Sequence, residues 1–181
     1  MPITSRSLGA LAAGAGALAL LALGASPAQA ATAGPACWTD GDTGAVRCFA
    51  DQDALLRGIA DATGGPVVAD PSGAPAVRAT ASPAGVDATF LLVTVYDQTG
   101  FTGSSMTYTT TNSAVCAVSH GFATLGSWND RIDSFQGFNG CSIALYRDIN
   151  FSPSTPISGP FNSTSDVGLS ARHQASSLVA G

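Results

Sequence analysis

An aromatic residue and a glycine, with six residues between them, frame the segment Tyr96-Asp97-Gln98-Thr99-Gly100-Phe101-Thr102-Gly103. Because glycine adopts the positive φ of a tight turn, this spacing in a strand-forming region predicts a strand that runs into such a turn. About thirty residues later the chain reads Trp128-Asn129-Asp130-Arg131-Ile132-Asp133-Ser134-Phe135. The amide, carboxylate and hydroxyl groups of this second segment form a cluster rich in oxygen.

Together, the two segments resemble the βγ-crystallin family, whose Greek-key motifs open with the same aromatic-x6-Gly pattern. The calcium signature of that family is Asn/Asp, Asn/Asp, two free positions, Ser/Thr and Ser. Asn129 to Ser134 fill these six positions with one departure, since Asp133 stands where Ser or Thr is usual. The departure keeps an oxygen ligand and adds a negative charge. The resemblance implies an all-β, βγ-crystallin-like double Greek-key β-sandwich.

A second, degenerate copy of the motif follows the first. Tyr146 to Pro153 keeps the spacing, but proline replaces the glycine. Arg172 to Ser177 keeps the final pair of serines and loses both acidic or amide positions. We expect one good calcium site and a second site that stays empty, because Arg172 and His173 bring positive charge to it.

The resemblance also implies a set of calcium ligands. The side chains of Asp130 and Asp133 and the carbonyl of Arg131 would face the ion, and a carbonyl near Asp148 would join them from the crossing loop. Asn129 would brace the loop. The predicted metal site comprises Asn129, Asp130, Arg131, Asp133, Ser134 and Asp148. Extracellular calcium modules bind at about 10⁻⁴ to 10⁻³ M, and we predict that range. The alternative is a plain polar turn that leads into a strand.

The first thirty residues have the pattern of a removed secretory signal. Arg6 supplies a positive charge, Leu8 to Ala25 is apolar, and Ala28-Gln29-Ala30 is a small-x-small cleavage triplet. The alternative is a membrane anchor, since an apolar run of about 18 residues is near the lower limit for a span. The triplet and the lack of a second hydrophobic segment favour a signal peptide at residues 1–30. We therefore predict a secreted, extracellular mature protein with no membrane segment.

Charge and composition narrow the choice of partners. From Ala31 onward the chain carries six Arg, twelve Asp and neither Lys nor Glu, a formal charge of −6. Nucleic acid requires a basic surface, so this balance argues against it. The same balance is compatible with divalent cations.

Four cysteines remain in the exported chain, which is an even number in an oxidising compartment. Of the three possible pairings, proximity in sequence favours Cys37 with Cys48 and Cys116 with Cys141. A zinc site is disfavoured, because the sequence has no Cys-x2-Cys pair and its two histidines stand at no ligand spacing.

Short elements precede the β-domain. Residues 31–64 predict a hairpin that the Cys37–Cys48 bridge would close, with a polar turn at Asp40 to Gly44, followed by a helix. The helix would begin after an Asp51 cap, bury Leu55, Leu56 and Ile59, and end at Gly64-Gly65. Residues 65–87, rich in Pro, Ala and Gly, read as a connector that includes a short strand at Val67-Val68. Whether the hairpin and helix pack on the β-domain is left open by the sequence.

Residues 88–181 predict the βγ-crystallin-like domain, with short strands separated by turn residues. We expect these strands at 90–96, 104–110, 115–119, 132–138, 141–147, 155–158, 161–164 and 175–179.

We do not expect an enzyme. The sequence has no Gly-x-Ser-x-Gly elbow, no phosphate loop and no His-Glu-x-x-His, and the mature chain has no Glu. The first functional hypothesis is a secreted calcium-binding module with Ca²⁺ as its only cofactor. The alternative is an inhibitor of an extracellular protease, since the chain also resembles the secreted bacterial metalloproteinase inhibitors of peptidase inhibitor family I36. The segment Thr111 to Ser127 is the predicted inhibitory loop. A killer-toxin-like secreted factor is a further possibility.

Overall fold

The computed structural model describes residues 34–72 and 87–181. The predicted signal peptide and residues 73–86 of the predicted connector lie outside these ranges. No helix among the described residues is long and apolar enough to cross a membrane.

Strands dominate the described part of the chain, which holds a single α-helix and three short 3₁₀ turns. The N-terminal elements are β1 (Ala36–Asp40), β2 (Val46–Phe49), α1 (Gln52–Thr63) and β3 (Val67–Val68). They are followed by β4 (Thr89–Gln98), β5 (Thr102–Thr110), η1 (Val115–Ala117), β6 (His120–Phe122), η2 (Gly126–Trp128) and β7 (Ser134–Gly137). The C-terminal elements are β8 (Ile143–Tyr146), η3 (Ile149–Phe151), β9 (Ser158–Phe161), β10 (Ser163–Thr164) and β11 (Ser177–Ala180).

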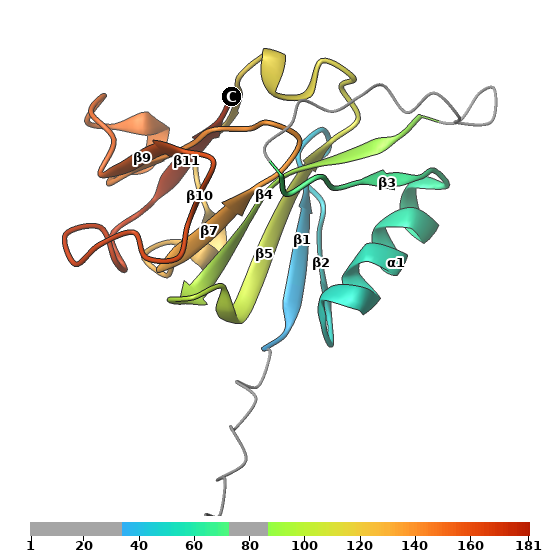
Figure 1. The fold of residues 1–181 in the computed structure, drawn as a ribbon, viewed down its shortest axis with the longest axis horizontal. Helices are drawn as coiled ribbons and strands as arrows, with labels where there is room; N and C mark the ends of the chain where they lie inside the picture. The colour runs from blue at the N-terminus through green and yellow to red at the C-terminus, as the bar shows by residue number, and fades with distance from the viewer. Residues whose placement is uncertain (1–33, 73–86) are drawn as a thin grey trace, which may run out of the picture. The chain divides into compact units, whose positions relative to one another are not determined.

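The strands form two sheets (Figure 1). The larger sheet has the order β10-β7-β4-β5-β1-β2, with β3 also paired to β4, and the smaller has the order β6-β11-β8-β9. The strand β6, from the first half of the β-domain, joins the smaller sheet, which the second half otherwise forms. The strand β10, from the second half, joins the larger sheet. This exchange is that of two Greek keys, so the predicted all-β, double Greek-key β-sandwich is confirmed.

One apolar core lies between the two sheets. The larger sheet contributes Val95 and Phe135, and the smaller contributes Ile143, Leu145 and Leu178, all fully buried. Side chains from the two facing sheets thus fill one common core, as in a β-sandwich. The core therefore joins the two Greek keys into one unit.

The N-terminal hairpin is part of the larger sheet. β1 pairs antiparallel with β2 and parallel with β5, so it extends the sheet at the β5 edge. The buried Trp38 indole Nε1 donates to Thr109 Oγ1 at 2.8 Å. The sequence left open whether the hairpin packs on the β-domain, and the pairing of β1 with β5 shows that it does.

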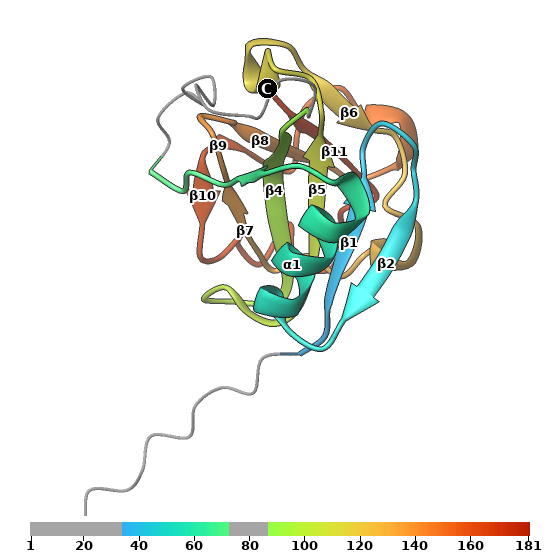
Figure 2. The same ribbon diagram turned by 90° about the vertical axis from the view of Figure 1, so that its right-hand side faces the viewer.

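The helix has the caps that the sequence predicts. Asp51 Oδ1 accepts from the Ala54 N–H at 2.7 Å, and Gly64 ends α1 in the left-handed conformation. Leu55 and Ile59 are buried against Ala36 and Trp38 in a second, smaller cluster. Figure 2 shows α1 lying over the face of the larger sheet near β1, away from the smaller sheet. An isolated helix of this length is marginal in water, so this docking stabilises it.

Both disulfides have the pairing that sequence proximity favours. Cys37 bonds to Cys48 within the hairpin, and Cys116 bonds to Cys141 across the β-domain. Two disulfides fit an oxidising compartment.

Three predicted strands are placed differently. The strand expected at 115–119 is wrong, because Val115–Ala117 form the turn η1 and β6 begins only at His120. Val115 has a φ of 40° there, which a strand does not allow. The strands expected at 155–158 and 161–164 shift to β9 and β10. β9 is an edge strand, which explains why it tolerates Pro160.

Candidate functional site

Matching corners in the two Greek keys place the residues of the calcium motif. Ser134 Oγ donates to the Gln98 carbonyl at 2.6 Å and accepts from the Phe101 N–H at 3.1 Å. Ser177 Oγ does the same with the Asp148 carbonyl at 2.6 Å and the Phe151 N–H at 3.0 Å.

An aromatic pair closes each corner. The rings of Tyr96 and Phe101 lie 5.9 Å apart, and those of Tyr146 and Phe151 lie 5.8 Å apart, both in edge-on geometry. The two copies of the motif inferred from the sequence therefore fold into corners with the same hydrogen bonds and the same aromatic pairing.

Residues of this motif line a shallow hollow between the two Greek keys. It has a volume of about 360 Å³ and is lined by Asp130, Arg147, Asp148, His173, Gln174 and Ser176. Asp130 adopts a left-handed φ of 56°, and its N–H donates to the Ala175 carbonyl at 2.9 Å. Asn129 Nδ2 donates to Asp130 Oδ2 at 2.7 Å. Two predicted ligands, Asp130 and Asp148, thus come together from opposite Greek keys.

Asp133 does not line this hollow and has different surroundings. It is buried, and its Oδ1 lies 3.2 Å from His173 Nε2, while this atom has no hydrogen-bond partner among the described residues. His173 stands in the second motif copy where Asp130 stands in the first, and it also has a left-handed φ. The two aspartates of the signature therefore contribute to separate places.

Two other residues of the predicted site have side chains that are engaged elsewhere, while the Arg131 carbonyl, its predicted ligand atom, stays a prediction. The Arg131 guanidinium donates to Asp97 Oδ2 at 2.8 Å and lies over the Trp128 ring at 4.7 Å. The Ser134 hydroxyl is used within its own corner. Arg172, expected to repel an ion, pairs with Asp166 instead.

The donor set of the hollow fits a hard cation only in part. Two carboxylates and the Ser176 hydroxyl are oxygen donors of the type that calcium prefers, and water or carbonyls would have to supply the remaining ligands. The Arg147 side chain donates to Gln174, so one positive charge lies beside these donors. Within the described ranges, no three His, Cys, Asp or Glu side chains group as a metal site.

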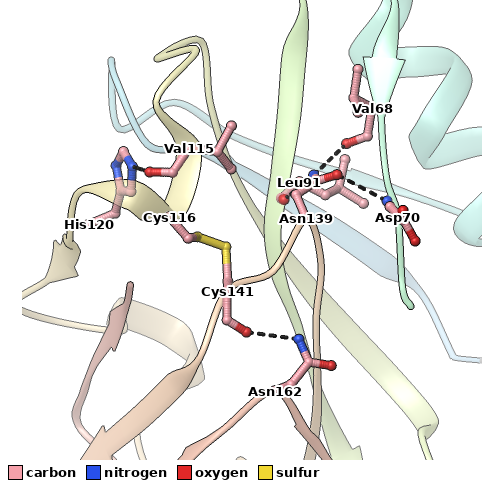
Figure 3. The surroundings of a disulfide bond; sticks show 9 residues. All are labelled: Val68, Asp70, Leu91, Val115, Cys116, His120, Asn139, Cys141 and Asn162. Atoms are coloured by element: carbon pink, nitrogen blue, oxygen red, sulfur yellow. Dashed lines mark hydrogen bonds between the residues drawn. A yellow bond between two sulfur atoms is a disulfide. The ribbon is translucent and has the colours of Figure 1, made fainter. Parts of the chain in front are cut away.

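The second candidate feature is the 111–127 loop, which follows β5, includes η1 and the short strand β6, and ends within η2. The Cys116–Cys141 disulfide ties its middle to the β-domain (Figure 3). His120 Nε2 donates to the Val115 carbonyl at 2.7 Å, and within the loop the Val115 N–H donates to the Asn112 carbonyl at 2.9 Å. Val118 is 43% exposed on this braced segment.

Strain and buried polar contacts mark the same region. Val115 is buried with a φ of 40°, which is rare for a β-branched residue and persists only where surrounding contacts impose it. Beside the disulfide, buried Asn139 Nδ2 donates to the carbonyls of Val68 at 3.0 Å and Leu91 at 2.8 Å (Figure 3). The segment that carries Cys141 is therefore fixed as well.

Sequence reasoning missed one residue at this loop. Asp42, interpreted as part of a plain polar turn, accepts hydrogen bonds from Thr110 and Thr111, 68 and 69 residues away along the chain. No local pattern signals such a contact, because β1–β5 pairing alone brings the two segments together.

The paired corners and the exchange of β6 and β10 between the two sheets define the fold as a βγ-crystallin-like double Greek key. Residues 94–157 match the family model of peptidase inhibitor family I36. Over those residues, this match agrees with the resemblance to peptidase inhibitor family I36 found in the sequence.

Solved structures with similarity to this chain are βγ-crystallin domains from Clostridium beijerinckii. The domain itself is 19% identical, with a TM-score of 0.35, and the alignment covers 49% of this chain and 95% of that one. A single mutant of the same domain is 20% identical, with a TM-score of 0.36 and the same coverage. No significant match is found among curated proteins.

Proposed function

We propose that this protein is a secreted, non-catalytic inhibitor of an extracellular peptidase, and that it binds the enzyme through the 111–127 loop. The observation that carries the proposal is the family match over residues 94–157, which contains this loop in full. The disulfides support the extracellular setting.

The rigidity of the loop supports the same function. Binding immobilises exposed side chains and loops at an entropic cost, and a loop already held in its bound shape lowers that cost. The 111–127 loop is held by a disulfide, by a hydrogen bond of Thr111 at its start and by the Leu125 N–H, which donates to the Ser176 carbonyl at 3.1 Å near its end. It also presents the exposed apolar Val118 side chain, which suits a side-chain pocket of a peptidase.

Titration against peptidases tests the proposal. The mature protein is added to a thermolysin-like metallopeptidase and to a subtilisin-like serine peptidase, and residual activity is measured. We expect stoichiometric loss of activity with one of the two enzymes. Digestion of the protein as an ordinary substrate by both enzymes would contradict the proposal.

A matched pair of variants tests the assignment of the loop. Val118→Asp places a charge on the 111–127 loop, and Leu169→Asp places the same charge on another surface loop, where Leu169 is 84% exposed. We expect Val118→Asp to raise the inhibition constant at least about tenfold, a loss of roughly 1.4 kcal/mol. Leu169→Asp should leave the constant unchanged. The reverse result would move the contact to the Leu169 loop.

A second candidate function, weak calcium binding, is favoured by the hollow that joins Asp130, Asp148 and Ser176. Bound there, the ion would link the two Greek keys and stabilise the fold by mass action. Calorimetry of the mature protein should show binding at about 10⁻⁴ to 10⁻³ M calcium. We expect Asp130→Ala to remove this heat and Asp133→Ala, which makes the same charge change outside the hollow, to retain it. No heat at millimolar calcium would exclude the site.

A further inference from the structure

The turn of the N-terminal hairpin lies against the start of the 111–127 loop. Asp42 Oδ2 accepts from the Thr111 N–H at 2.7 Å and from Thr111 Oγ1 at 2.9 Å. Asp42 Oδ1 accepts from Thr110 Oγ1 at 3.2 Å. Hydrogen bonds to an ionised carboxylate are about twice as strong as neutral ones, so one side chain secures the point where β5 becomes the loop.

The hairpin presents this carboxylate in a fixed position. Asp40 pairs with Thr109 in the β1–β5 register, and the Gly41 N–H donates to the Thr109 carbonyl at 2.9 Å. A Cβ on Gly41 would lie 2.3 Å from that carbonyl oxygen, so the close approach requires glycine. Asp40 Oδ1 in turn accepts from the Asp42 N–H at 2.9 Å, and the Cys37–Cys48 bridge closes the hairpin.

The first part of the loop, from Thr111 to Cys116, is therefore held at two points. Asp42 holds Thr111 at its start, and the disulfide holds Cys116. Between them, Asn112 Oδ1 accepts from the Ala114 N–H at 2.9 Å, which closes a local turn. Removal of the Asp42 clamp would leave the disulfide as the nearest fixed point and would free the residues that precede it.

We propose that Asp42 is a positioning residue for the peptidase-binding loop, so that the hairpin at residues 36–49 is part of the inhibitory unit. The hairpin lies outside the residues matched by the family model, 94–157. This inference rests on the proposed function and adds to it the element that shapes the binding loop. Asp42 itself need not touch the peptidase.

Two substitutions at Asp42 and one control test the proposal. Asp42→Ala removes all three hydrogen bonds, whereas Asp42→Asn keeps one acceptor oxygen. Asp61→Ala makes the same charge change on the exposed face of α1. For each protein, the inhibition constant, the thermal midpoint and the hydrogen exchange of residues 110–119 are measured with both disulfides intact.

We expect Asp42→Ala to raise the inhibition constant by about tenfold to a hundredfold, as loss of preorganised contacts predicts. Faster exchange at residues 110–119 should accompany this change, with little change in the thermal midpoint. Asp42→Asn should give an intermediate effect, and Asp61→Ala should match the wild type. If Asp42→Ala does not fold, the Asp42→Asn variant supplies the comparison.

Failure of this inference is distinguishable from failure of the proposed function. A wild-type protein that inhibits neither peptidase overturns the proposed function, and exchange at residues 110–119 then still decides whether Asp42 orders the loop. An inhibiting wild type with Asp42 variants that inhibit equally well overturns the inference. Unchanged loop exchange, or an equal loss in Asp61→Ala, also overturns it.

Discussion

Single side chains in this protein show how burial and pairing decide the role of a polar group. Ser134 and Ser177 are fully buried, and each bridges a carbonyl and an N–H. Tyr108 is also buried, but its hydroxyl has no hydrogen-bond partner within the described residues. A buried, unpaired hydroxyl costs free energy, whereas the two serines satisfy the backbone.

Tyr108 gives a prediction at this scale. Burial raises its pKa well above the usual value of about 10. A raised pKa in the folded state means that stability is present below about pH 10 and is lost as pH rises, because tyrosine ionises first in the unfolded chain. Tyr108→Phe should therefore be at least as stable as the wild type at pH 8, since it removes an unpaired hydroxyl.

Urea unfolding at intervals from pH 8 to pH 11 measures this effect. The wild type should lose stability more steeply than Tyr108→Phe above about pH 10. Part of the slope should remain in the variant, because burial also raises the pKa of Tyr96. Equal slopes for the two proteins would contradict the prediction.

The elements of the fold combine local signals with long-range support. The helix α1 begins and ends where Asp51 and Gly64 predict, because caps satisfy backbone groups within a few residues. The sheet depends on long-range contacts, since β1 pairs with β5, which lies far from it in the sequence.

The cap of α1 can be tested by substitution. Asp51→Ala leaves the Ala54 N–H without its acceptor and should lower the free energy of unfolding by about 0.5 to 2 kcal/mol. Asp61→Ala, in the last turn of the same helix, removes a negative charge from the end where the helix dipole disfavours it. Chemical denaturation should thus show a loss for the first variant and none for the second. A similar loss in both would indicate a general effect of charge.

The described unit as a whole is stabilised by one core between two sheets, a smaller cluster under α1 and two covalent links. The links act in different places. Cys37–Cys48 closes the N-terminal hairpin, and Cys116–Cys141 ties the 111–127 loop to the segment that leads into β8.

Removing each link separately should reveal their contributions. In the chain-entropy account, a disulfide contributes roughly 3 kcal/mol, and a longer closed loop contributes more. The separations are 11 residues for Cys37–Cys48 and 25 for Cys116–Cys141. The Cys116→Ser/Cys141→Ser variant should therefore lose slightly more stability than the Cys37→Ser/Cys48→Ser variant. Urea denaturation measures both losses, and a clearly larger loss in the hairpin variant would contradict this order.

Much of the candidate site escaped prediction because it depends on which segments meet. The signature Asn129 to Ser134 places its residues in one loop, yet Asp130 faces a hollow shared with Asp148 while Asp133 lies beside His173. Asp130 and Asp133, three positions apart in this loop, have different surroundings, so spacing alone does not assign two carboxylates to one ion.

The sequence by itself determined what depends on near neighbours: the caps of α1, the glycine turn after Tyr96, the repeat of the aromatic corners and the favoured pairing of cysteines. Only the tertiary structure decided that the hairpin joins the sheet beside β5 and that Asp42 reaches Thr111. The physical reason is the range of the interactions. Caps and turns satisfy backbone groups within a few residues, whereas sheet edges and side-chain clamps join whichever distant segments the packed core brings together.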